Sequence, residues 1–323
     1  MQHILAVAVG QGSHASGTVV RDVIANKHTQ EMRPYVTGLI SGLEKLGLKG
    51  GQDFDIDYAT AEPSRLKALV KSAIGQRRPD AIFAMSTSAL KAAMSVTKDI
   101  QIVFPSISDP KEDGVAKTCA APGKNATGVR SMRRQSAPEC IELFKATVPS
   151  LRKVFGFHKP AYGPATRAIK ELKKSAAAAK VAFTAVAVKS HKDIATKLAA
   201  IKQAGPDGKP QVGVLVLPDD LVLSAWRDIT HSAHARKIPT FLPITDWVKA
   251  GSPSALAGYG VPQLTGGEAA AAYMYKILKG VPARDLPIKR CGGFEWAVSK
   301  AVAASIGISI PDSVVKAADR VVG

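Results

Sequence analysis

The stretch PDAIFAMSTSALKAAMSVTKDIQIVF, residues 79–104, decides the fold of this chain. An apolar run at 81–85 leads through a Ser/Thr-rich turn into an amphipathic segment at 88–97, and a second apolar run follows at 102–104. Apolar runs this short predict buried strands, and the segment between them has the length and periodicity of a helix. A strand, a helix and a strand in this order predict a parallel β-α-β unit.

The same alternation extends from this stretch in both directions. Strands at 4–9 and 54–58 and helices at 31–46 and 63–76 complete a first unit. A second unit repeats the pattern, with strands expected at 154–158, 182–188, 212–217 and 240–244 and helices at 164–180, 192–204 and 221–236. The sequence therefore predicts the α/β class, with two lobes that each hold a parallel sheet flanked by helices.

The turn-rich sequence APGKN at 121–125 is suited to a boundary between the lobes. A helix expected at 264–279 and a C-terminal tail remain after the second unit. If that helix returns to the first lobe and the tail to the second, the chain crosses between lobes three times. We therefore expect residues 1–123 plus 246–285 in an N-terminal lobe and residues 124–245 plus 286–323 in a C-terminal lobe.

Composition excludes several classes of protein. Hydrophobic residues make up 46% of the 323 residues, which rules out general disorder, and no apolar run reaches the ~18–20 residues of a membrane span. The net charge of +18 raises the question of a nucleic-acid partner. The basic residues are scattered along expected helices without interleaved aromatics, so we interpret them as solvated faces and expect no nucleic acid.

Hydroxyl and acidic side chains follow the expected strands. In open α/β sheets ligands bind beyond the carboxyl ends of the strands, so these positions predict a ligand cleft. Ser86-Thr87-Ser88 opens a helix, where hydroxyls and free N–H groups suit an anionic group or a plain helix cap. The acidic and aromatic candidates, each of which could instead cap a turn or fill the core, are Ser108-Asp109, Asp219, Asp246, Tyr162, Trp247 and Tyr259.

Catalytic motifs are weak in this sequence. Neither a zinc-protease HExxH, a GxSxG elbow nor a phosphate-binding GxxxxGK[ST] loop occurs, and three cysteines at irregular spacing suit neither a zinc site nor a redox pair. Residues 10–15, GQGSHA, fit a dinucleotide fingerprint formally, but no clear helix follows them. We therefore expect binding without chemistry, no cofactor and no metal.

Ordered short motifs indicate a family. The chain resembles ABC-transporter substrate-binding proteins of the group that includes tryptophan- and tyrosine-type binding proteins. The resemblance rests on GLEKLG at 42–47, DIDY at 55–58, PDAI at 79–82, STSA at 86–89, SDP at 108–110, PGKNATGV at 122–129 and ISIPDS at 308–313. Each motif is loose, and their ordered spacing across nearly the whole chain is the specific part.

The resemblance implies a type I periplasmic-binding-protein fold with three crossovers, which closes around a small solute. It further implies a monomer that is exported to the periplasm, its signal removed, and that delivers its ligand to an ABC permease. The contacts it carries over are Ser86, Thr87, Ser88, Ser108, Asp109, Tyr162, Asp219 and Asp246. Our leading hypothesis is that the chain is a receptor for an amino acid or a similar zwitterion. We expect it not to be an enzyme.

Two alternatives and one basic cluster stay open at this point. The main alternative is a ligand-sensing regulatory module of the same fold, although no helix-turn-helix precedes residue 4. A second alternative, a dehydrogenase, is supported by the glycine pattern at 10–15 only. Arg130, Arg133 and Arg134 stand where the family is less basic. We expect this cluster at the cleft mouth of the second lobe, either as a solvated rim or as an anion-binding group.

Overall fold

The computed structural model describes residues 2–9, 32–61, 63–131, 137–160, 162–202 and 210–323. The chain forms two compact units, one of Met1–Met132 with Gln263–Gly292 and one of Arg133–Pro262 with Gly293–Gly323. It therefore passes from one unit to the other three times. The helix near 264 belongs to the first unit and the C-terminal tail to the second.

The units differ from the expected lobes in three short segments. Residues 124–132 and 286–292 belong to the first unit because each contains a strand of its sheet. Residues 246–262 belong to the second unit because they contain a strand that pairs within that unit's sheet. Each chain crossing thus lies after a strand, and the last two lie at turn-forming residues, Gly260-Val261-Pro262 and Gly292-Gly293.

The first unit contains a six-stranded sheet. Its order is β11-β5-β4-β3-β1-β2, and every neighbouring pair is parallel. The strands are β1 (Gln2–Val9), β2 (Phe54–Ala61), β3 (Ala81–Ala84), β4 (Gln101–Ile107), β5 (Ala126–Arg130) and β11 (Lys289–Arg290). Because the strands are parallel, their carboxyl ends share one edge of the sheet.

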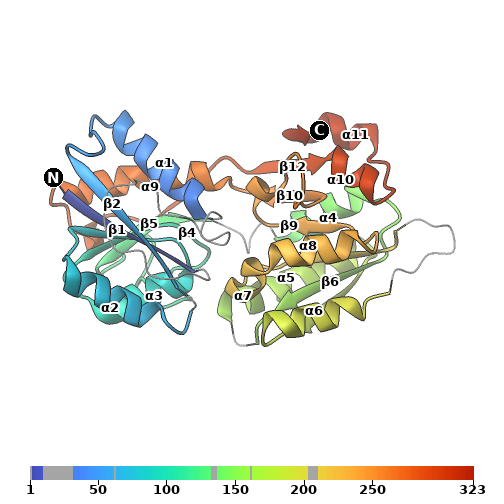
Figure 1. Cartoon of the computed structure of the whole chain (residues 1–323), viewed down its shortest axis with the longest axis horizontal. Helices are drawn as coiled ribbons and strands as arrows, with labels where there is room; N and C mark the ends of the chain where they lie inside the picture. The colour runs from blue at the N-terminus through green and yellow to red at the C-terminus, as the bar shows by residue number, and fades with distance from the viewer. Residues whose placement is uncertain (1, 10–31, 62, 132–136, 161, 203–209) are drawn as a thin grey trace. The chain divides into compact units, whose positions relative to one another are not determined.

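Two pairs of helices cover this sheet. Figure 1 shows α1 (Arg33–Lys45) and α9 (Gln263–Leu278) over one face and α2 (Leu66–Gln76) and α3 (Thr87–Val96) over the other. A short 3-10 helix, η3 (Ala283–Asp285), follows α9. Apolar residues of α2 and α3 pack on β3 and β4 in one buried cluster, and their burial removes the apolar faces of both helices from water.

Helices α1 and α9 approach each other at glycines. A Cβ at Gly38 would lie 2.1 Å from the Leu264 carbonyl oxygen, and one at Gly267 would lie 2.1 Å from the Tyr35 carbonyl oxygen. Only glycine permits backbones to come this close. The Lys45 ammonium also lies 2.8 Å from the Glu268 carboxylate. These contacts attach the returning helix firmly to the first unit.

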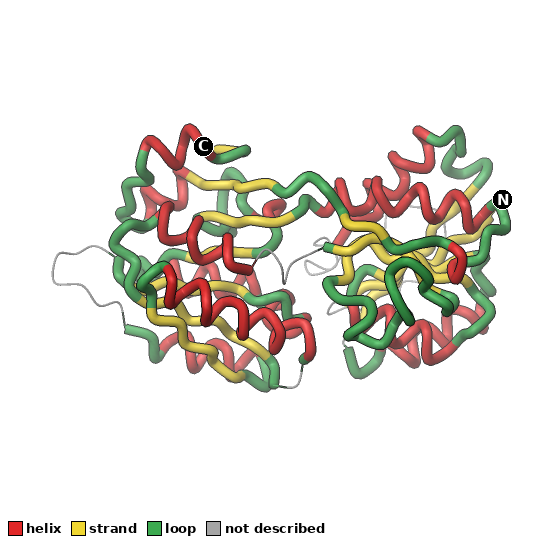
Figure 2. Tube along the Cα trace, turned by 180° about the vertical axis from the view of Figure 1, so that it is seen from behind, coloured by secondary structure: helices red, strands yellow, loops and turns green. Residues whose placement is uncertain are grey.

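The second unit contains a seven-stranded sheet of order β13-β12-β10-β9-β8-β6-β7. All neighbouring pairs are parallel except β10 and β12. The strands are β6 (Lys153–His158), β7 (Ala182–Ala187), β8 (Val212–Val216), β9 (Thr240–Leu242), β10 (Ala257–Gly260), β12 (Glu295–Ser299) and β13 (Arg320–Val322). In Figure 2, seen from behind, the yellow strands of each unit lie together among red helices.

Helices also cover both faces of the second sheet. One buried cluster joins the strands to α4 (Ala137–Thr147), α5 (Gly163–Ala178), α10 (Lys300–Ser305) and α11 (Asp312–Ala317). The other cluster joins them to α6 (His191–Ala199), α7 (Asp220–Ser224) and α8 (Trp226–His234). The helix expected at 221–236 is therefore two helices, which divide at Ala225.

Candidate functional site

The first unit presents hydroxyl, acidic and basic groups at one edge of its sheet. The neighbouring strands β3, β4 and β5 end at Ala84, Ile107 and Arg130, and their parallel pairing places the residues that follow them at the same edge. The sequence predictions at Ser86–Ser88 and Ser108–Asp109 therefore lie on adjacent strand ends. The structure adds Arg130 and Ser131 to this edge.

Ser86, Thr87 and Ser88 form the start of α3. Ser86 is the N-cap, and its hydroxyl oxygen accepts a hydrogen bond from the Ala89 N–H at 3.1 Å. Ser86 and Thr87 are buried, whereas Ser88 is partly exposed. The cap leaves the Ser86 hydroxyl able to donate its own hydrogen, next to the positive end of a ten-residue helix.

Ser108 and Asp109 follow β4 in a buried turn. The Ser108 and Ser131 hydroxyl oxygens lie 3.2 Å apart and form a buried hydrogen bond. One Asp109 carboxylate oxygen lies 3.8 Å from an Arg130 guanidinium nitrogen, and the Asp109 side chain is only 6% exposed. The ends of β4 and β5 thus place the Asp109 carboxylate beside the Arg130 guanidinium, and each of these residues has a serine next to it in the sequence.

The structure corrects the expected position of Arg130. This residue is the last of β5, which pairs with β4 and β11 in the first unit and not in the second. The Gly128 conformation contributes to this placement, because its φ of +149° and the Phe104 backbone beside it exclude a Cβ. Arg133 and Arg134, and the glycine pattern at 10–15, lie outside the described residues.

In the second unit Asp219 has a structural role. It is fully buried, and its carboxylate caps α7 by accepting hydrogen bonds from the N–H groups of Leu221 and Val222. The other carboxylate oxygen accepts from the Lys159 N–H at 2.7 Å. Burial raises the pKa of Asp219, and these three N–H donors oppose that rise. Asp219 thereby joins the turns after β6 and β8.

Tyr162 lies beside the same turns. Its hydroxyl donates a hydrogen bond to the Asp220 carboxylate at 2.9 Å, and the tyrosine is partly exposed. Because β6 and β8 are neighbours, the structure brings Tyr162 and Asp219 together at the carboxyl edge of the second sheet. Asp220 was not among the predicted residues, although it directly follows one of them.

Asp246 and Trp247 belong to the 3-10 helix η2 (Thr245–Trp247), which follows β9. Asp246 is partly exposed. Trp247 is buried and stacks on Trp226 of α8, with ring centroids 4.7 Å apart and planes 4° from parallel. This contact is the core role that the sequence left open for Trp247.

Tyr259 lies in β10, where its ring contacts Phe294 at a centroid distance of 5.4 Å. Its side chain also packs against the apolar cluster beneath α4 and α5. Burial, followed by the negative charge of Glu139, raises the pKa of the Tyr259 phenol. The phenol therefore stays protonated and can donate a hydrogen bond.

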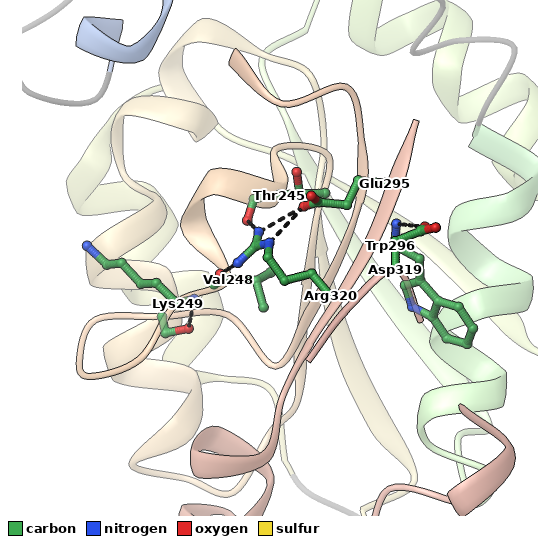
Figure 3. A network of polar contacts seen from close by, with 8 residues as sticks. Thr245, Val248, Lys249, Glu295, Trp296, Asp319 and Arg320 are labelled. Carbon is green, nitrogen blue, oxygen red and sulfur yellow. Dashed lines mark hydrogen bonds and ion pairs between the residues drawn. The ribbon is translucent and has the colours of Figure 1, made fainter. Parts of the chain in front are cut away.

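Arg320 in the terminal strand fixes η2. Figure 3 shows its guanidinium between the Thr245 and Val248 carbonyl oxygens, each of which accepts a hydrogen bond at 2.6 Å. The same group forms two hydrogen bonds to the Glu295 carboxylate, at 3.0 and 2.9 Å. The turn that carries Asp246 is thus held from both ends by one side chain.

A surface cavity of about 370 Å³ lies elsewhere in the second unit. The end of α8, the loop at 251–254 and α10 line it, with His231 and His234 as its titratable residues. The α8 end precedes β9, so the cavity lies toward the amino ends of the strands. It is therefore separate from the predicted site residues.

Among the described residues no group of three or more His, Cys, Asp or Glu side chains could hold a metal ion. The described cysteines Cys119, Cys140 and Cys291 are all free thiols, and burial raises the pKa of Cys140 to about 12. A thiol with that pKa is a poor nucleophile. The helices of the described part of the chain are also too short or too polar to cross a membrane.

Two units, each with a sheet of mainly parallel strands covered by helices on both faces, are typical of two-lobed periplasmic binding proteins. The chain belongs to the ABC transporter substrate binding protein family, whose profile matches residues 23–322. Proteins of this family bind small-molecule ligands for ABC permeases, act outside the cytoplasm and are in general not enzymes.

Individual relatives show how far the similarity extends. A tyrosine-binding protein of Clostridioides difficile is 27% identical over 253 residues, which cover 78% of this chain and 70% of the relative. The structure of a conserved domain protein from Vibrio cholerae has a TM-score of 0.80 and 25% identity, and the match covers 99% of this chain and 100% of that chain. An ABC domain in complex with L-Trp from Streptococcus pneumonia has a TM-score of 0.78, 22% identity and the same coverage, and shows that the fold is shared.

Proposed function

We propose that this chain captures an amino acid, or a similar small zwitterion, and delivers it to the membrane subunits of an ABC importer. The family supplies the general activity, and a relative named as a tyrosine-binding protein supports an aromatic amino acid as the ligand. The residues at the carboxyl edge of the first sheet support the choice of a zwitterion.

One observation carries this proposal: a group suited to an anion and a group suited to a cation lie at the ends of neighbouring strands. The start of α3, with Ser86, Thr87 and Ser88, favours a carboxylate, whereas Asp109 after the next strand favours an ammonium. An α-amino acid carries both charged groups on one carbon atom. A neutral sugar could donate its hydroxyl hydrogens to Asp109, but it has no anionic group for the start of α3.

We propose that residues of the second unit contribute to the same ligand. Tyr162 and Asp246 are partly exposed at the carboxyl edge of that unit's sheet. Tyr259 offers a ring and a protonated hydroxyl to an aromatic side chain. Asp219 and Trp247 support these residues from within the core, through the α7 cap and the stack on Trp226.

A thermal-shift screen with all twenty L-amino acids, their D-enantiomers, nucleosides and sugars tests the ligand class. We expect L-tyrosine or L-tryptophan to raise the melting temperature, because ligand at 100 times its Kd adds about 2.7 kcal/mol to the free energy of unfolding. Calorimetry then gives the affinity and the stoichiometry. Stabilisation by a sugar or nucleoside, with no amino acid active, would contradict the proposal.

Delivery to a permease is tested in the organism that encodes the chain. We expect the protein in the periplasmic or extracellular fraction, and we expect deletion of its gene to reduce uptake of the radiolabelled ligand. Reintroduction of the wild-type gene should restore uptake. Unchanged uptake in the deletion strain would count against delivery, even if the purified protein binds the ligand.

A further inference from the structure

Arg130 occupies a position that the family resemblance does not explain. It ends β5 at the carboxyl edge of the first sheet, and its Cα pairs with Ile107 of β4 and Arg290 of β11. Its side chain is only 19% exposed. The neighbouring residue Ser131 shares a buried hydrogen bond with Ser108, so the backbone that carries Arg130 is fixed on both sides.

The described surroundings leave the hydrogen-bonding capacity of this guanidinium largely unused. Its Nε–H is buried and has no hydrogen-bond partner among the described residues. The Asp109 carboxylate oxygen lies 3.8 Å from the nearest guanidinium nitrogen, which is too long for a hydrogen bond. A buried donor without a partner is unfavourable, so a group that accepts these hydrogen bonds would bind with a gain.

The chemistry of Arg130 selects the kind of group that fits. A guanidinium presents parallel N–H donors that match the two oxygens of a carboxylate. The nearby Asp109 balances the charge of the arginine, which makes a buried cation tolerable there. Together the two side chains form a close pair of opposite charges, and the zwitterionic end of an α-amino acid is complementary to such a pair.

We propose that Arg130 binds the carboxylate of the ligand and is the residue that makes this receptor specific for ligands carrying one. This inference rests on the proposed function and deepens it, because it names the ligand's acidic group as the determinant of affinity. Asp109 then has two partners, the guanidinium and the ligand's ammonium. The start of α3 supplements Arg130 through the Ser88 region.

The test compares acids with their amides. L-Tyrosine and L-tryptophan are titrated against the wild-type protein and against Arg130→Gln, Arg130→Lys and Arg290→Ala, alongside L-tyrosinamide and L-tryptophanamide. We expect Arg130→Gln to weaken binding of the amino acids by about 10- to 100-fold and binding of the amides by less than about twofold. Arg130→Lys should fall between Arg130→Gln and the wild type, since a lysine keeps the charge but not the paired donors.

Arg290→Ala is the matched control. It removes the same charge from the register-paired position of the next strand, where the side chain is exposed, and we expect affinities within about twofold of the wild type. Equal losses for acids and amides in Arg130→Gln, or no loss for either, would overturn the inference. Melting temperatures of all variants separate a folding defect from a binding defect, and Arg130→Lys provides the comparison if Arg130→Gln does not fold.

The proposed function can fail separately. If the wild-type protein binds no amino acid, the same proteins are titrated with acetate, benzoate and succinate. Binding of one of these carboxylates that Arg130→Gln abolishes would retain the role of Arg130 and reject an amino-acid ligand. A wild-type protein that binds no carboxylate at all would overturn both.

Discussion

Asp109 and Asp219 show how the surroundings of an aspartate decide its role. Both are buried and both follow a strand. Asp219 accepts three backbone hydrogen bonds and holds two turns together. Asp109 instead lies beside Arg130 at a distance that leaves room for a further partner on the guanidinium. The first is part of the scaffold, and the second is suited to a ligand.

We therefore expect Asp109→Asn and Asp246→Asn each to weaken ligand binding by about 10- to 100-fold while the fold stays intact, because each removes a carboxylate that could pair with an ammonium. Titration calorimetry measures the affinity. Asp99→Asn, at an exposed position before β4, is the control of equal charge and should bind normally. Undiminished affinity in both test variants would rule out the zwitterion hypothesis.

His234 is expected to make stability depend on pH. Its ring lies 2.9 Å from the Thr240 hydroxyl, and burial, followed by the charge of His231, lowers the pKa of His234 from 6.5 to about 4. Between pH 6.5 and about pH 4, His234 is therefore protonated in the unfolded chain but neutral in the folded chain. The contribution of His234 to the free energy of unfolding should thus be constant above about pH 7 and fall by on the order of 1–3 kcal/mol toward pH 4.

Urea unfolding of the wild type, His234→Gln and His231→Gln between pH 4 and 8 checks this dependence. The glutamine at 234 can keep a hydrogen bond to Thr240 but cannot titrate, so that part of the acid destabilisation should disappear. His231 is exposed, and its replacement should leave most of the effect. Parallel pH profiles for all three proteins would assign the dependence to other groups.

At the scale of elements, Arg320 connects the last strand of the chain to η2. Arg320→Ala removes hydrogen bonds to two carbonyl oxygens and to Glu295. Because the side chains of this ion pair are 36% and 22% exposed, we expect a modest loss of about 1–3 kcal/mol in the free energy of unfolding. Ligand affinity should also fall several-fold, because the turn that carries Asp246 becomes less rigid.

Denaturant unfolding and calorimetry measure these two effects. Arg284→Ala is a suitable control, since the Arg284–Asp285 pair spans 3.9 Å and both side chains are mostly exposed. It should change the free energy of unfolding by less than about 0.5 kcal/mol. An Arg320→Ala protein as stable as the Arg284→Ala protein would show that the terminal strand does not hold η2.

Continuous apolar runs could be predicted as strands from the sequence where helices bury the strand on both faces. The strand at 212–217, observed as β8 (Val212–Val216), is an example. The missed strands lack that signal: β10 is AGYG, and β13 is the three-residue RVV. Their pairing depends on distant segments, such as the antiparallel contact of β10 with β12.

The candidate site shows the same limit. Strand-end positions could be predicted, because a parallel sheet places them on one edge. Whether an aromatic side chain there serves the core could not be predicted, since Trp247 finds its stacking partner in α8 and not near it in sequence. Likewise, Arg130 is visible in the sequence as part of a basic cluster, but only the strand order places it in the first unit.

At the scale of the whole molecule, the three chain crossings suggest a response to ligand. Each unit has its own sheet and its own buried clusters, so we expect the two to behave as separate bodies when the ligand binds. We expect the radius of gyration to decrease when saturating ligand is added, because a ligand that contacts residues of both units favours the arrangement that brings them to it.

Small-angle scattering of the wild-type protein with and without the identified ligand measures this compaction.

The variants Arg130→Gln and Asp246→Asn, whose positions lie in different units, extend the test. Either variant, at ligand concentrations that saturate it, should compact less than the wild type if its residue stabilises the liganded arrangement through the bound molecule. A ligand can shift the equilibrium between the free and the liganded arrangement only as far as its affinities for the two differ. Replacing a residue that contacts the ligand equally well in both arrangements would therefore lower the affinity without changing the radius of gyration at saturation. An unchanged radius of gyration in the wild type, with binding confirmed by calorimetry, would mean that one unit alone holds the ligand. The residues at the carboxyl edge of the first sheet would then have to account for all of the affinity.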